Sequence, residues 1–308
     1  MPSDDLSERL VASINASYGV HPGHRAAHAK GVLCAANFTP TAAATRLSRA
    51  LHLRGGEVRA HVRFSNGSGD PTAPDTARDA RGVAVKFYLA DGTTTDVVAI
   101  SLPAFFARTP EDLLAFNDAR RPDPATGAPD VERVGAYLAE HPEALPAVTA
   151  AMTHPLPASY AGVTYNSLHA FGFEGENGTR FGRYHFVPEH GDESLSEAEA
   201  GVQPADYLSE ELEKRFTRGS AIFHVRVELA AADDSIDDPT AVWPEGREQV
   251  ELGQLRVTGR AFDRERAGDV LVFDPTRVTD GIRCPDDPIL LARSGAYRVS
   301  VSRRTSAT

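Results

Sequence analysis

Two side chains near the C-terminus have the types and the spacing of a charge-assisted metal ligand. Arg293 and Tyr297 are four residues apart, so on a helix they share one face. A phenol has a pKa of about 10, and a nearby positive charge is needed to hold it as a phenolate on iron. Arg293 can supply that charge, and Asp287 can anchor Arg293 from the other side. The pattern makes Tyr297 a candidate metal ligand, although a tyrosine taken alone is more often a core or interface residue.

A candidate proton-transfer group lies at the opposite end of the chain. His28 follows Arg25-Ala-Ala, and Ser65 ends a strand-like run. Taken alone, such a histidine is more often structural than catalytic. Together with His21 and His24 it could also be a metal-ligand set. The dipeptide Pro22-Gly23 disfavours that reading because it argues against a helix there.

Five spaced segments together resemble the haem catalases. Residues 273–297 are similar to the segment that carries the family's axial tyrosine. Residues 25–31 resemble the segment of the distal histidine, and residues 63–69 resemble the strand whose serine hydrogen-bonds that histidine. Residues 76–88 resemble the most recognisable stretch of the family, and residues 103–108 resemble a segment of haem-lining aromatics. The resemblance covers roughly residues 20–305 and breaks over the helical insert and over about 190–270.

The resemblance implies haem b as the cofactor and gives roles to particular residues. His28 would be the distal base, Ser65 would hydrogen-bond it, and Tyr297 would be the axial ligand. His169 would complete a relay behind the tyrosine with Asp287 and Arg293. The remaining family positions would bind the two haem propionates or line the haem pocket, and they are Arg25, Arg63, Arg304, Phe105 and Phe106. Arginines from distant segments are suited to a buried dianionic cofactor.

One departure from the family concerns the distal pocket. Catalases have an asparagine where this chain has Ile100, which cannot hydrogen-bond a second hydrogen peroxide molecule. We therefore expect a haem-dependent peroxidase that reduces organic hydroperoxides, and hydrogen peroxide only weakly, through a ferryl intermediate with a small-molecule electron donor. A true small catalase, a fatty-acid hydroperoxide isomerase of the allene-oxide-synthase kind and a non-catalytic haem carrier remain alternatives.

Bulk properties narrow the class of protein further. The formal net charge of −11 argues against nucleic-acid binding. Two cysteines make no disulfide framework, and we see neither a signal peptide nor a run of about 20 apolar residues. These features favour a cytoplasmic protein. Without the long N-terminal arm of catalases, we expect a monomer or homodimer.

Hydrophobic periodicity predicts an α+β protein with an antiparallel barrel or sheet. The resemblance implies a single catalase-like haem domain over residues 1–308, an antiparallel β-barrel with helical insertions in a minimal version lacking the N-terminal arm and the C-terminal domain. The expected helices cover residues 3–18, 42–51, 110–119, 130–140, 142–152, 206–217 and 290–297 or beyond, and about 110–152 forms a helical insert. The expected strands cover residues 26–38, 58–64, 82–89, 95–101, 163–174, 180–187, 220–230 and 249–259.

Overall fold

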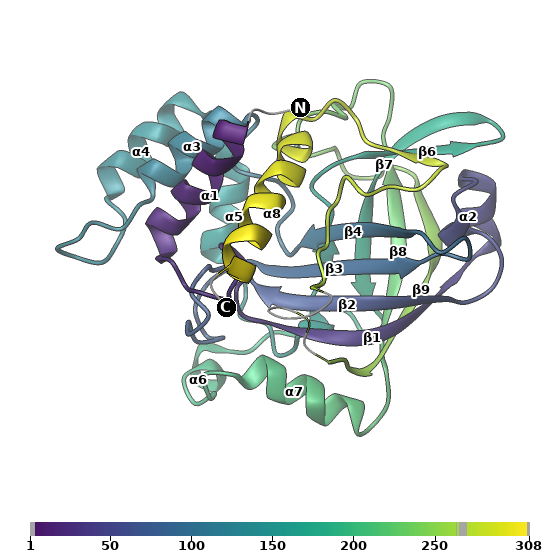
Figure 1. Cartoon of the computed structure of the whole chain (residues 1–308), viewed down its shortest axis with the longest axis horizontal. Helices are drawn as coiled ribbons and strands as arrows, with labels where there is room; N and C mark the ends of the chain where they lie inside the picture. The colour runs from purple at the N-terminus through teal and green to yellow at the C-terminus, as the bar shows by residue number, and fades with distance from the viewer. Residues whose placement is uncertain (1–3, 263, 265–269, 307–308) are drawn as a thin grey trace.

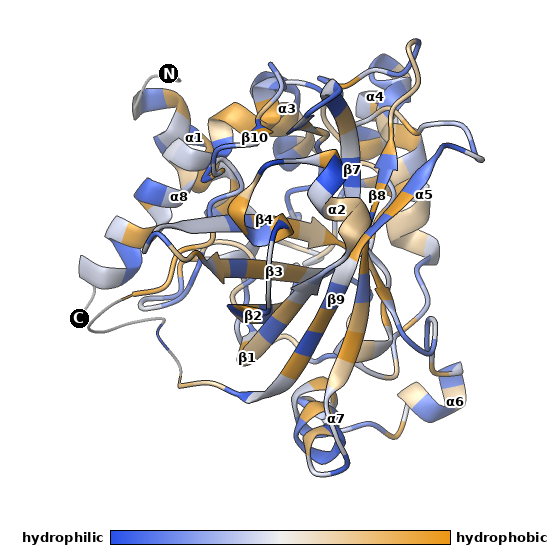
Figure 2. Cartoon of the chain, turned by 90° about the vertical axis from the view of Figure 1, so that its right-hand side faces the viewer, coloured by the Kyte–Doolittle hydropathy of each residue, from blue (hydrophilic) through white to orange (hydrophobic). Residues whose placement is uncertain are grey.

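The strands of the barrel follow from alternating side chains. In β8 (Ala221–Leu229) every second residue, beginning with Ala221, is buried and the intervening ones are partly exposed. This period of two is that of a strand with one face on the core. Figure 2 shows the same alternation as bands of hydrophobic and hydrophilic residues along several strands. In β3 (Arg81–Tyr88) most residues on both faces are buried, so both sides of that strand are covered.

The computed structural model describes residues 4–262, 264 and 270–306. Among these residues, eight antiparallel strands form a closed barrel in the order β7-β5-β4-β3-β2-β1-β9-β8, and β8 returns to pair with β7. The other bounds are β1 (Gly31–Pro40), β2 (Val58–Asn66), β4 (Thr94–Ile100), β5 (Tyr165–Asn166), β7 (Gly178–Pro188) and β9 (Gln249–Arg260). Two further strands, β6 (Phe171–Gly175) and β10 (Ile282–Arg283), extend the sheet beyond β7.

The barrel has a filled interior and a covered patch on its outer face. Large buried aromatics fill the inside, among them Phe38, Phe64, Phe87, Phe186 and Phe223. On the opposite face, Leu33 packs with Ala84 and Val98 under Leu271 and Phe273. The segment that contains Leu271 and Phe273 therefore lies against the outside of the barrel before the chain enters its last helix.

Most helices gather at one end of the barrel, on the left in Figure 1. They are α1 (Asp4–Tyr18), α3 (Pro110–Ala119), α4 (Val131–Glu140), α5 (Leu145–Thr153) and α8 (Pro288–Ser306). Helix α1 packs against both α3 and α8. The rest are α2 (Ala42–Leu47), α6 (Glu197–Ala200), α7 (Tyr207–Phe216) and the 3₁₀ turns η1 (Leu51–Leu53), η2 (Pro142–Ala144) and η3 (Tyr160–Gly162). No helix within the described ranges is long and apolar enough to cross a membrane.

The predicted fold class is confirmed, and most predicted elements are present. Helix α3 has the predicted bounds because Thr109 and Asp112 form a reciprocal capping box with Pro110 in the first turn. The predicted start of the first helix at residue 3 lies outside the described residues. Strands β6 and β7 form a hairpin around Glu176-Asn177, with Gly175 paired to Gly178.

Three predicted boundaries were wrong. The strand expected at 163–174 is two short strands, because the Ser167 hydroxyl replaces a ladder partner by accepting from Tyr184 N and donating to His169 O. The helix expected over 42–51 ends at Leu47, where Ser48 turns extended. The strand expected at 26–38 begins only at Gly31, because the backbone at His28 is left-handed with a φ of 55°.

One buried histidine in η1 makes the stability of this fold depend on pH. His52 is 2% exposed and stacks on Phe87 with ring centroids 5.0 Å apart. Neither of its ring nitrogens has a hydrogen-bond partner among the described residues. Burial lowers the pKa of His52 from 6.5 to about 3.

We predict that replacing His52 with Leu flattens the pH dependence of the free energy of unfolding. Below pH 6.5 His52 is protonated in the unfolded chain but stays neutral in the folded protein. This difference at His52 lowers the free energy of unfolding by about 1.4 kcal/mol per pH unit as the pH falls from 6.5 toward 3. Urea unfolding at several pH values between 6.5 and 4.5 would measure the slope. His190→Leu, at an exposed position, is the control. Equal slopes for wild type and His52→Leu would contradict the prediction.

Candidate active site

A row of paired residues crosses the outer face of four adjacent strands. Gly31 pairs with Ser65, Ser65 with Gly82, and Gly82 with Ile100. Directly paired residues point to the same side of a sheet. Their neighbours Phe64, Val83 and Ala99 belong to the interior core. The row therefore faces outward, with Ser65 and Ile100 on either side of a glycine.

Gly82 leaves a notch in this row that the His28 ring fills. A Cβ at Gly82 would lie 2.8 Å from both Cε1 and Nδ1 of His28 and 2.9 Å from the Ser65 hydroxyl. The His28 Nδ1 atom is 3.0 Å from Ser65 Oγ. His28 has the only positive φ among the described non-glycine residues, and this uncommon backbone conformation turns its side chain onto the sheet.

A network in the loop between β2 and β3 supports that turn. The His28 and Ala29 amides donate to the Gly67 and Ser68 carbonyls, at 3.1 and 3.0 Å. The buried side chain of Arg81, which is 1% exposed, holds the same loop. Its guanidinium donates to three loop carbonyls, those of Asp75, Ala77 and Asp79. The left-handed turn at His28 is thus fixed by main-chain bonds to a loop that a buried arginine holds.

The electrostatic surroundings keep the His28 imidazole neutral. Its pKa is lowered from 6.5 to about 3 by burial of the ring and then by the positive charges of Arg63, Arg293 and Arg25. A hydrogen bond with the Asn66 backbone opposes this shift. The three arginines come from separate segments of the chain, and the charge of each acts on His28.

Helix α8 carries the Arg293 and Tyr297 pair on one face. Arg293 Nε and Nη2 donate to the Tyr297 hydroxyl at 3.1 and 2.5 Å. Within the described ranges, Arg293 forms no salt bridge with a carboxylate. Its positive charge is therefore directed at the tyrosine oxygen, as the four-residue spacing predicted.

Asp287 fixes the start of the same helix. One carboxylate oxygen accepts from Leu290 N at 3.0 Å, and the other lies 2.6 Å from His169 Nδ1. Both side chains are buried, and burial lowers the pKa of His169 although the Asp287 carboxylate opposes this. The two Asp287 oxygens thus contact Leu290 N and His169 Nδ1, and among the described residues no hydrogen bond joins Asp287 to Arg293. The anchoring of Arg293 by Asp287 stays a prediction.

Two of the predicted propionate-binding arginines meet at one backbone oxygen. Arg25 Nη2 and Arg304 Nη2 both donate to Leu271 O, at 3.0 and 3.3 Å. Arg63 lies on the outer face of β2, 5% exposed, and donates to Ala29 O at 3.3 Å. A Cβ at Gly31 would lie 2.8 Å from the Arg63 guanidinium carbon, so the glycine makes room for this arginine.

The two predicted pocket aromatics have different surroundings. Phe105 and Phe106 are 4.5 Å apart between ring centroids, and both are partly buried. The Phe105 amide donates to Pro239 O at 2.8 Å. Phe106 stacks on Phe116 of α3 at 4.9 Å and belongs to the small core of the helical insert. Phe106 therefore joins the insert to the segment that follows Ile100.

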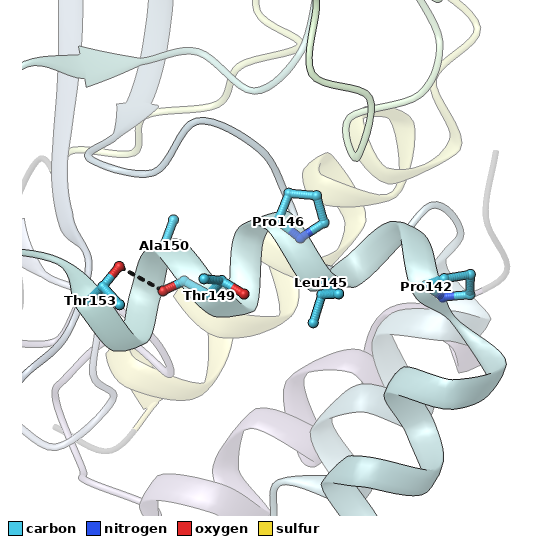
Figure 3. Close-up of a pocket in the computed structure, with 6 residues that line it drawn as sticks. All are labelled: Pro142, Leu145, Pro146, Thr149, Ala150 and Thr153. Carbon is cyan, nitrogen blue, oxygen red and sulfur yellow. Dashed lines mark hydrogen bonds between the residues drawn. The ribbon is translucent and has the colours of Figure 1, made fainter.

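A separate hollow on the outer side of α5 has no ionisable side chain among its lining residues. Figure 3 shows its lining residues, Pro142, Leu145, Pro146, Thr149, Ala150 and Thr153. None of these side chains titrates near neutral pH, and the Thr153 hydroxyl donates to the Thr149 carbonyl at 2.9 Å. The hollow therefore lacks a candidate catalytic group.

Sequence reasoning missed two contributors to the candidate site. Gly82 acts through the side chain it lacks, and Leu271 acts through its backbone carbonyl. A correct prediction of the strand pairing would have pointed to Gly82, because Gly82 pairs with Ser65 on one side and with Ile100 on the other. A backbone acceptor such as Leu271 O has no signature in the residue type.

Comparisons with known proteins agree on one family. A family model described as catalase matches residues 21–308. A catalase-related peroxidase of Mycolicibacterium paratuberculosis is 42% identical over 302 residues, covering 97% of this chain and 94% of the relative. A catalase-related peroxidase of Synechococcus elongatus is 34% identical over 299 residues, covering 97% of this chain and 88% of the relative.

Solved structures give the same result for the fold. The structure of a bacterial catalase aligns with a TM-score of 0.79 at 25% identity, covering 91% of this chain and 57% of that chain. A fungal catalase aligns with a TM-score of 0.80 at 24% identity, covering 91% of this chain and 59% of that one. The chain thus spans less than two thirds of the solved catalases it matches. On the family model and the two short relatives, this chain belongs to the catalase family, in its catalase-related peroxidase branch.

Proposed function

We propose that this chain is a haem-dependent peroxidase that reduces organic hydroperoxides with electrons from a small-molecule donor. The observation that carries the proposal is the His28 ring, seated in the Gly82 notch between Ser65 and Ile100. The names of the two short relatives, both catalase-related peroxidases, support the reaction class.

The residues around the candidate site fit a haem b group. Arg25, Arg63 and Arg304 bring three cations from distant segments, which suits the two propionates of the cofactor. Gly31 and Gly82 make room for the Arg63 guanidinium and the His28 ring, the two groups that would face a bound macrocycle. Tyr297 would be the axial ligand, with Arg293 stabilising its phenolate form. Bound haem would supply the redox chemistry of O–O cleavage and donor oxidation.

His28 would move the proton in this reaction. Its lowered pKa keeps the ring neutral near pH 7, so it can accept a proton from one peroxide oxygen. Returning that proton to the other oxygen lets it leave as water or an alcohol. Ser65 would fix the ring through Nδ1, which leaves Nε2 for the substrate.

Ile100 would decide which peroxide is used best. It lies beside the notch on the opposite side from Ser65, so its apolar side chain borders the space that His28 serves. Dismutation of hydrogen peroxide needs a second small polar molecule held in that space. An isoleucine offers that molecule no hydrogen bond, whereas it can contact the alkyl group of an organic hydroperoxide.

We expect the haem-loaded protein to oxidise a donor with tert-butyl hydroperoxide and to release little oxygen from hydrogen peroxide. Ile100→Asn should raise the rate of oxygen release by roughly 10-fold, about the effect of one added hydrogen bond to a bound reactant. An oxygen electrode and a chromogenic donor assay would measure both activities.

Ile100→Val is the matched control for that substitution and should behave like wild type, because it stays apolar. Fast, sustained oxygen release by the wild type would instead make the chain a true small catalase. A rearranged fatty-acid product without donor oxidation would make it an isomerase. An unchanged rate of oxygen release in Ile100→Asn would show that Ile100 does not limit the dismutation of hydrogen peroxide.

We predict that Tyr297→Phe weakens haem binding by at least about 10-fold, since it removes the axial ligand itself. The haem-to-protein ratio and the Soret band after reconstitution are the readouts. Tyr207→Phe is the control, because the Tyr207 hydroxyl donates to the Pro157 carbonyl, which lies outside α8 in the sequence. Full haem loading with an unchanged spectrum in Tyr297→Phe would rule out the axial role.

Gly82→Ala should lower kcat/KM by about 100-fold, because its methyl group would push the His28 ring away from Ser65 and from the substrate. Peroxide kinetics would measure the loss, and circular dichroism would check the fold. Gly56→Ala is the control, since a Cβ there meets no atom within 4 Å. Wild-type kinetics in Gly82→Ala would show that the notch does not position the base.

A further inference from the structure

Three possible metal ligands converge where α3, α4 and η2 meet. Asp112 lies in the first turn of α3, His141 directly follows α4, and Glu143 lies in η2. One ligand atom from each residue lies within 4.8 Å of the other two. His141 Nδ1 is already 3.1 Å from a Glu143 carboxylate oxygen. All three residues are partly buried.

Local structure holds the side chains of Asp112 and His141 in place and positions the backbone of Glu143. The Asp112 carboxylate accepts from Thr109 N at 3.0 Å in the capping box, and in the described chain it accepts no other hydrogen bond. The amide of His141 caps α4 by donating to Tyr137 O, and its ring stacks on the Tyr137 ring at 4.3 Å. Pro142 begins η2 and restrains the turn that brings Glu143 back to His141.

The charges in this cluster are unbalanced. No lysine or arginine in the described ranges forms a salt bridge with Asp112 or Glu143. Both carboxylates act on the same neighbouring group, the Tyr137 hydroxyl. Burial is the main cause of the raised pKa of this hydroxyl, and the negative charges of Asp112 and Glu143 raise it further. Two partly buried carboxylates directed at one point repel each other unless a cation joins them.

We propose that Asp112, His141 and Glu143 bind one divalent metal ion of the zinc class. An imidazole nitrogen with two carboxylate oxygens is a donor set that Zn²⁺ accepts, with water in the fourth position. Zinc bonds of about 2.0–2.2 Å put tetrahedral ligand atoms roughly 3.3–3.6 Å apart. Rotation of the partly exposed Glu143 side chain would close the remaining distance in the cluster.

An ion at this point would tie the helical insert to the segment before α3. The Tyr137 hydroxyl lies 3.2 Å from Phe106 O and 3.3 Å from Asp112 O. The site has no residue in common with those around His28 and Tyr297, and it does not depend on the proposed peroxidase reaction.

The test is titration of the haem-loaded, metal-stripped protein with Zn²⁺ against a chromophoric chelator. We expect one ion per chain with micromolar or tighter affinity, and a higher melting temperature with Zn²⁺. His141→Gln and Glu143→Gln should each weaken binding by at least about 10-fold. Glu140→Gln is the matched control, because Glu140 is an exposed residue at the end of α4 outside the cluster.

Two results would overturn the proposal. One is the absence of stoichiometric Zn²⁺ binding to the wild type. The other is binding that is unchanged in both His141→Gln and Glu143→Gln, which would locate the ion at other histidines. Circular dichroism shows whether a variant is folded, and the Glu143 variant leaves the ring stack on Tyr137 in place.

Discussion

The buried carboxylate of Asp287 joins helix α8, which carries Arg293 and Tyr297, to His169. Its two oxygens serve different parts of the molecule, since one caps α8 and the other holds His169 beside the sheet. A carboxylate that accepts a backbone amide at a helix start also favours the helix dipole. Because α8 carries Arg293 and Tyr297, this side chain helps to place the tyrosine relative to the barrel, together with the packing of α8 on α1 and α3.

The second constraint is the register of strands β1 to β4. The pairing of Ser65 with Gly82 and of Gly82 with Ile100 decides which side chains border the His28 ring. A shift of one residue would turn all three positions into the barrel interior. The packed aromatics inside prevent such a shift, so the core and the candidate site are specified by the same pairing.

Local signals in the sequence predicted some of these features and could not predict others. Helix α3 was predictable because its capping box lies within four residues, and the Arg293–Tyr297 pair because it lies on one helical face. The break at Ser167 and the left-handed turn at His28 depend on tertiary hydrogen bonds, so periodicity missed both. The meeting of Arg25 with Arg304, and of Asp112 with His141, joins residues distant in sequence that have no spacing motif.

The wide separation of His28 and Tyr297 along the chain has a consequence for biogenesis. Synthesis runs from the N-terminus, so the strand after His28 is made long before its barrel partner β9 and before helix α8. Contacts of such high sequence separation form slowly, because a long loop must close first. A nascent chain that has reached α7 carries His28 and Ser65 but not Tyr297. Capture of the proposed haem between His28 and Tyr297 would therefore be confined to a late stage of folding, after translation is nearly complete.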